Sequence, residues 1–167
     1  MSERVDHPGA RLHPSGNCGD RPAHAVLDAV VIHYTALPLA ESLELLSRPG
    51  HEASTHYVIA RDGTLYQLVP ESRRAWHSGV SRLGDRERVN DFSIGIDLVY
   101  VPGVDPGYTE IQYEILFDLL DGIRRRHPIR DDLITGHEDV ALPPGRKADP
   151  GPLFNWSRVR AWLSEKK

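Results

Sequence analysis

The chain has 167 residues, of which 40% are hydrophobic and 26% charged, and its formal net charge is −4. This length fits one domain with a sizeable core, and the balance of residue types is that of an ordinary globular protein. The small negative charge and the scattered basic residues exclude a surface built for nucleic acid. The longest apolar run is too short to span a membrane, and a single cysteine, Cys18, excludes an internal disulfide.

Residues 1–23 are polar and rich in proline, glycine and histidine. They predict an irregular arm that lies on the surface of one folded domain, residues 24–167. The arm has no apolar stretch typical of a signal peptide. We therefore expect a cytoplasmic protein, with a periplasmic location as the alternative if a leader has been removed. We expect a monomer.

The first half of the domain combines two strand patterns with a helix. The stretch AVLDAVVIHYTA, residues 25–36, contains a β-branched run that predicts a buried strand ending near His33. Apolar residues at helical spacing predict a helix over residues 39–48, which the following Pro-Gly pair ends. The stretch HYVIARDGTLYQLVP, residues 56–70, has two alternating runs around Asp-Gly, which is typical of a β-hairpin.

The second half begins with a long Arg-rich loop, residues 71–91. SIGIDLVY predicts a core strand, and residues 109–127 have the best helical pattern in the chain, with Thr109 as its cap. A short strand, DLITG, leads into a run rich in proline and glycine, residues 136–154, which we expect to be irregular. An amphipathic helix closes the chain. Because strands alternate with helices, we predict an α/β fold: a single domain with a central mixed β-sheet flanked by helices.

Two of the nine histidines lie where a rigid element ends. His33 closes the first buried strand, and His137 follows the short strand DLITG. Asp149 comes twelve residues later, before a proline. Two imidazoles and a carboxylate can bind zinc as three protein ligands and leave the fourth position open, as in catalytic zinc sites. Spacing alone is weak support, because Asp149 also suits a turn before proline.

Two further charged residues fit such a site. Lys147 precedes Asp149 by two positions, so in an extended segment both side chains face the same way. A lysine there would stabilise a developing oxyanion, and the alternative is a solvated cation in a loop. Asp97 is the acid in the apolar strand SIGIDLVY. Opposite a metal site it could act as a general base, and the alternative is an edge-strand acid that faces solvent.

Together these stretches resemble the zinc-dependent N-acetylmuramoyl-L-alanine amidases of type 2, which are related to peptidoglycan recognition proteins. The resemblance covers about residues 26–163. It rests on four stretches in this order: VVIHYTA, STHYVIARDGTLYQLVPESRRAWHSGVS, RERVNDFSIGIDLVY and ITGHEDVALPPGRKADPGPLFNW. It implies a zinc site in a surface cleft beside the sheet. It also implies hydrolysis of the amide between N-acetylmuramic acid, or its 1,6-anhydro form, and L-alanine.

The resemblance also implies roles for single residues. It places Zn²⁺ on three ligands, His33, His137 and Asp149, and gives Asp97 and Lys147 the catalytic roles of base and oxyanion stabiliser. It places four residues along the groove for a peptidoglycan or muropeptide substrate: Trp76, His77, Arg88 and Asn90. An arginine there suits a peptide carboxylate. A non-catalytic muropeptide-binding module is the alternative function, although such modules typically lack a zinc ligand.

The sequence departs from the family pattern in several places. Asp97 replaces the usual glutamate, which shortens the reach of the carboxylate by roughly 1.3–1.5 Å. Thr55 stands where phage enzymes have tyrosine. The ligand loop is about two residues longer than in the cytoplasmic recycling amidases, while the segment from His33 to His56 is short, as in amidases that act on intact wall. The choice between intact wall and anhydro-muropeptide therefore stays open, as do the roles of His56 and Cys18.

Overall fold

The computed structural model describes residues 4–167, and its centre is a six-stranded mixed sheet in the order β1-β5-β4-β9-β3-β10. Four of these strands are neighbours in the core part of the sheet: β4 (Tyr57–Ile59), β9 (Ser93–Leu98), β3 (Ala29–Tyr34) and β10 (Ile134–Gly136). These four run parallel to one another. The strand β5 (Leu65–Gln67) pairs antiparallel with β4, which confirms the predicted hairpin.

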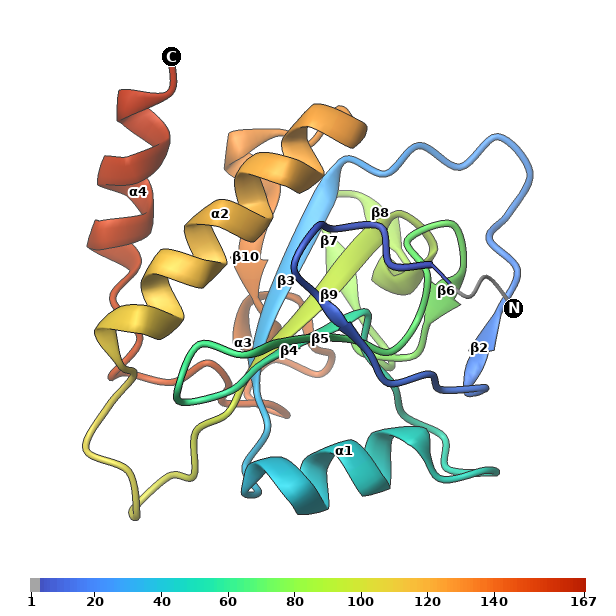
Figure 1. Ribbon diagram of the computed structural model, residues 1–167. Helices are drawn as coiled ribbons and strands as arrows, with labels where there is room; N and C mark the ends of the chain where they lie inside the picture. The colour runs from blue at the N-terminus through green and yellow to red at the C-terminus, as the bar shows by residue number, and fades with distance from the viewer. Residues whose placement is uncertain (1–3) are drawn as a thin grey trace.

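Side chains alternate along β3 and β9, so the two faces of the sheet carry different residues. On one face, Val30, Ile32, Ile94 and Ile96 pack with apolar side chains of α2 (Glu110–Arg126) and α4 (Trp156–Glu165). Figure 1 shows these two helices side by side along the sheet. The predicted mixed sheet with flanking helices is thereby confirmed.

The second face is covered differently. The helix α1 (Leu39–Ser47) packs there against Val58 and Val99, and the segment around Val89 and Phe92 packs against Val31. His33 is two residues from Val31 along β3, and Asp97 is two residues from Gly95, the ladder partner of Val31, along β9. Both residues therefore belong to this second face. Both side chains therefore point away from α2 and α4.

The long loop predicted for residues 71–91 contains short regular pieces. These are β6 (Arg74–Ala75), β7 (Arg82–Leu83), β8 (Arg86–Glu87) and the 3-10 helix η1 (Val89–Asp91). A second 3-10 helix, η2 (Asp131–Leu133), precedes β10.

The sequence predicted that residues 136–154 are irregular, and this is only partly right. The run begins with one helical turn, α3 (His137–Val140). The carboxylate of Asp139 accepts a hydrogen bond from the backbone N–H of Gly136 at 3.0 Å, which caps the turn. Neither glycine nor proline occurs within the turn itself, so they do not prevent it.

The N-terminal arm is more closely integrated than its composition suggests. Two short strands tie it down: β1 (Arg11–Leu12) runs parallel to β5, and β2 (Cys18–Gly19) pairs with β6. His7 and Asn17 are buried. The division of the chain at residue 23 stays a prediction. Among the described residues, none of the helices combines the length and the apolar character needed to cross a membrane.

Candidate functional site

The three predicted metal ligands converge at one end of the parallel strands. In the ladder between β10 and β3, Gly136 lies opposite Ile32, so the next residues, His137 and His33, are neighbours. The Nδ1 atoms of these histidines lie 3.1 Å apart, and the Oδ2 atom of Asp149 lies 3.0 Å from His33 Nδ1 and 3.1 Å from His137 Nδ1. All three residues are buried.

These three atoms fit a small cation. Ligands at 2.0–2.2 Å from a tetrahedral ion stand about 3.3–3.6 Å apart, only slightly more than the separations found here. Burial raises the pKa of Asp149, but hydrogen bonds with His137 and His33 outweigh burial and hold this pKa well below its usual range. Burial lowers the pKa of His33, but Asp149 and Asp97 outweigh burial and raise it. The ionised carboxylate of Asp149 thus offers a negative charge to a cation among these three atoms.

The other ring nitrogens of the two histidines contact protein groups. His137 Nε2 donates to the carbonyl oxygen of Ser78 at 3.1 Å, and His33 Nε2 lies 3.1 Å from His77 Nδ1. Each histidine therefore turns Nδ1 toward the cluster and Nε2 toward the segment 77–78. Asn90 Oδ1 accepts the backbone N–H groups of His77 at 3.3 Å and Ser78 at 2.8 Å, which holds that segment in place.

Asp97 lies next to this cluster. It is the ladder partner of His33 between β9 and β3, and Val58 is its partner on the other side, so β9 is no edge strand. The alternative of a solvent-facing edge acid is therefore wrong, and the residue is 8% exposed. Burial raises the pKa of Asp97 to about 6, although the nearby charge of His33 opposes this shift. A carboxylate with such a pKa can take up a proton near neutral pH.

Three of the four predicted groove residues line one hollow of about 220 Å³. Trp76, Arg88 and Asn90 line it together with Glu52, Arg74, Gly79 and Asp91. Arg74 pairs with Asp91 at 2.9 Å, whereas Arg88 Nε lies 3.4 Å from the same carboxylate and its side chain is 71% exposed. The guanidinium of Arg88 is therefore accessible to a ligand. The fourth residue, His77, does not line this hollow; it is buried behind His33, and its pKa is lowered well below the usual value, chiefly by burial.

Lys147 is exposed on the loop before Asp149. Its charge partly opposes the rise in the pKa of His33, so the ammonium lies within electrostatic reach of the cluster. The loop itself is anchored at two points. The backbone N–H of Glu138 donates to the carbonyl of Asp149 at 2.9 Å, and Arg146 donates to the carbonyls of Ser78 and Val80. Glu138 and Arg146 therefore hold the two ends of the loop to the rest of the fold.

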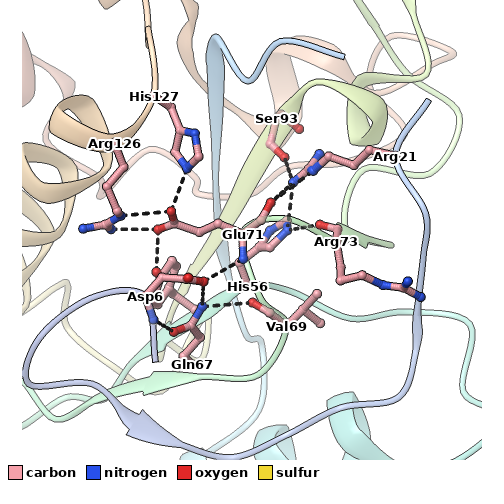
Figure 2. Close-up of polar contacts among 11 residues, drawn as sticks. Asp6, Arg21, His56, Gln67, Val69, Glu71, Arg73, Ser93, Arg126 and His127 are labelled. Atoms are coloured by element: carbon pink, nitrogen blue, oxygen red, sulfur yellow. Dashed lines mark hydrogen bonds and ion pairs between the residues drawn. The ribbon is translucent and has the colours of Figure 1, made fainter. Parts of the chain in front are cut away.

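A second polar cluster lies near the site and was not expected from the sequence. Figure 2 shows the Glu71 carboxylate beside Arg126 and His127, and the Arg21 side chain beside His56 and Ser93. Glu71 also accepts from the Tyr57 hydroxyl at 2.6 Å. Because the charged groups at its centre are paired, this cluster is built for structure and not for chemistry.

His56 belongs to this second cluster. Its Nδ1 atom accepts the backbone N–H of Gly95 at 3.0 Å, and burial lowers its pKa to about 3. The ring is therefore a neutral support between β9 and the loop that follows β5. Its contacts come from positions far apart in the sequence, so no local pattern could reveal them.

A sequence profile of the N-acetylmuramoyl-L-alanine amidase family matches residues 22–152. The chain belongs to this family and is an amidase, as the resemblance implied. Among its relatives, the 1,6-anhydro-N-acetylmuramyl-L-alanine amidase AmpD of Enterobacter cloacae is 50% identical over an alignment that covers 93% of this chain and 90% of the relative.

Solved structures agree with this assignment. The crystal structure of a selenomethionine derivative of AmpD matches with a TM-score of 0.82 and 33% identity, over 97% of this chain and 99% of that one. AmiD from Escherichia coli, solved with the substrate anhydro-N-acetylmuramic acid-L-Ala-D-γ-Glu-L-Lys, matches with a TM-score of 0.74 and 33% identity. This match covers 86% of this chain and 60% of that one.

Proposed function

We propose that the protein is a zinc-dependent hydrolase that cleaves the amide between N-acetylmuramic acid, in its 1,6-anhydro form, and L-alanine. The observation that carries this proposal is the convergence of His33, His137 and Asp149 beside the buried carboxylate of Asp97 in a chain of the amidase family. Two histidines and one carboxylate are a ligand set of catalytic zinc. Zn²⁺, when bound, supplies a Lewis acid that lowers the pKa of water and polarises the carbonyl.

The protein groups then have separate tasks. Asp97 accepts the proton of the attacking water and delivers it to the nitrogen of the leaving L-alanine. Its pKa of about 6 suits both halves of this transfer. The ammonium of Lys147 stabilises the negative charge that develops on the carbonyl oxygen. The side chain of Arg88, which is 71% exposed, binds a carboxylate of the stem peptide.

Two relatives favour the 1,6-anhydro form of the substrate. The Enterobacter cloacae relative is named for this substrate, and AmiD was solved with an anhydro-muropeptide. Intact wall is the competing substrate, as the short segment after His33 suggested. A cytoplasmic location and a monomeric state stay predictions, which cell fractionation and light scattering would check.

The test measures cleavage, substrate form and zinc with one enzyme stock. Mass spectrometry should detect free peptides that begin with L-alanine after incubation with anhydro-muropeptide, and much less peptide release from polymeric wall. Chelation should abolish cleavage and added Zn²⁺ should restore it, whereas a His137→Ala variant should not recover. Binding of the muropeptide without any cleavage at one Zn²⁺ per chain would support the alternative of a non-catalytic module and contradict the proposal.

A further inference from the structure

A chain of hydrogen bonds leads from His33 away from the metal cluster. His33 Nε2 lies 3.1 Å from His77 Nδ1, and His77 Nε2 lies 3.1 Å from the hydroxyl oxygen of Ser93. That hydroxyl donates in turn to the carbonyl of Val89 at 2.6 Å. His33, His77 and Ser93 are buried. Bulk water therefore does not compete for these bonds.

The proton positions along this chain follow from its far end. A carbonyl oxygen can only accept, so the single hydroxyl proton of Ser93 lies on the bond to Val89. The oxygen of Ser93 must then accept a proton from His77 Nε2. A neutral imidazole carries one proton, and in His77 that proton is then on Nε2. Its Nδ1 atom is therefore an acceptor that faces His33.

An acceptor at this place determines which nitrogen of His33 carries the proton. His33 Nε2 must donate to His77 Nδ1, so the neutral form of His33, which is the form that binds a metal, has its lone pair on Nδ1, the atom in the cluster with His137 and Asp149. The Ser78 hydroxyl, 3.0 Å from His77 Nδ1, shares the same lone pair as a second donor. It does not reverse the direction of the bond.

Packing fixes the ring of His77 in this position. A Cβ atom added at Gly95 of β9 would lie 2.5 Å from Cγ of His77, so the absence of a side chain in the strand provides the space for the ring. On its other side, Asn90 holds the backbone of residues 77 and 78 through two N–H groups. The ring is thus confined by the sheet and by the loop.

We propose that His77, itself oriented by Ser93, is a positioning residue that places the proton of His33 on Nε2 and directs His33 Nδ1 to the metal. Both of its ring nitrogens are used for this purpose, so it has no free nitrogen for a substrate. Metal-binding histidines commonly donate their second N–H to a carboxylate, carbonyl or water, and here another imidazole takes that place. The inference relies on the proposed function for the identity of the ion.

The first test reads the tautomer of His77 in the unmodified protein. Long-range ¹H–¹⁵N correlation spectra of the zinc-free protein should show His77 protonated on Nε2 and unprotonated on Nδ1. A proton on His77 Nδ1 would reverse the chain and overturn the proposal. Because this experiment needs neither zinc nor substrate, it separates the proposal from the proposed function, which would instead fail if the unmodified protein bound no Zn²⁺.

The second test measures Zn²⁺ affinity by competition with a chromophoric chelator. A His77→Leu variant should bind Zn²⁺ about 10–100-fold more weakly. His77→Asn, whose amide oxygen can take the place of Nδ1 as acceptor, should recover most of the affinity. His7→Leu is the matched control, because His7 is also buried but bonds Asp118 of α2, and its affinity should be unchanged. Equal affinity of His77→Leu and the unmodified protein would refute the proposal.

If His77→Leu does not fold, the Ser93→Ala variant tests the proposal instead. This variant leaves the ring in place but removes the acceptor of its Nε2 proton. It should show a mixture of His77 tautomers and weaker binding of Zn²⁺. An unchanged tautomer together with unchanged affinity would refute the role given to Ser93.

Discussion

Replacing Glu71 by glutamine tests whether the second polar cluster stabilises the fold. Burial raises the pKa of Glu71, but hydrogen bonds from His127, Arg126 and Tyr57 outweigh burial and lower it to about 2. The ordinary value is 4.5. Because the folded-state pKa is the lower one, the ionised carboxylate contributes stability above pH 4.5, and this contribution is lost as the pH falls toward 2.

Lowering the pKa of Glu71 from 4.5 to about 2 stabilises the folded state by about 3 kcal/mol at pH 7 and by only about 1 kcal/mol at pH 3. The side chain of Glu71 is 3% exposed, so screening by solvent does not reduce these values much. Glu71→Gln keeps the shape and removes the charge. It should lower the free energy of unfolding by about 3 kcal/mol at pH 7, which agrees with the range of about 3–5 kcal/mol for breaking buried ion pairs.

Urea denaturation of both proteins at pH 7 and pH 3 measures this difference. The matched control is Glu44→Gln, which removes an exposed pair with Arg48 on α1 and should leave the stability unchanged within error. A loss below 1 kcal/mol at pH 7, or a loss of the same size at both pH values, would refute the reasoning. A loss of the same size at both pH values would mean that the charge of Glu71 does not cause the change in stability.

Four further predictions concern the site. Asp97→Asn should lower kcat by about 10²–10⁴-fold without changing the Zn²⁺ content measured by atomic absorption, and a matching loss of metal would mean that Asp97 supports the ligands instead. Because the base must be ionised, and its pKa is about 6, kcat/KM should fall about tenfold per pH unit well below pH 6; a flat profile from pH 7 to pH 5 would exclude this group as the base. Arg88→Ala should raise KM about 10–100-fold with little change in kcat, whereas Arg125→Ala, on the exposed end of α2, should change neither. Gly95→Ala should weaken Zn²⁺ binding, because the added methyl group would displace His77, and unchanged affinity in calorimetric titrations would contradict this.

The positions of the two histidines proposed as metal ligands follow from local patterns in the sequence. A β-branched run that ends at His33 and a short strand before His137 place both residues at strand ends, and parallel strands bring such ends together. Asp97 was harder to interpret because an acid in an apolar strand suits an edge as well as a core. Strand order decided this question, and strand order depends on contacts between residues far apart in the chain.

His77 shows a limit of predicting side-chain roles from the sequence. The resemblance to the amidase family placed it along the substrate groove. In the structure the loop folds back onto β9, where Gly95 leaves room for the imidazole ring behind His33. Only the packing of the loop on the sheet determines which of two neighbouring residues, Trp76 or His77, faces outward.

The way the arm is attached bears on how the polypeptide can be divided. The guanidinium of Arg21 donates to the carbonyls of Glu71, Asn90 and Ser93, which belong to the segment that carries Asn90 and His77. The family match begins only at residue 22. A fragment that begins at that border would lack the clamp on this segment, while the severed peptide would carry the Arg21 guanidinium and the residues of β1 and β2, which pair with β5 and β6. The two pieces should therefore recombine when mixed, as in fragment complementation.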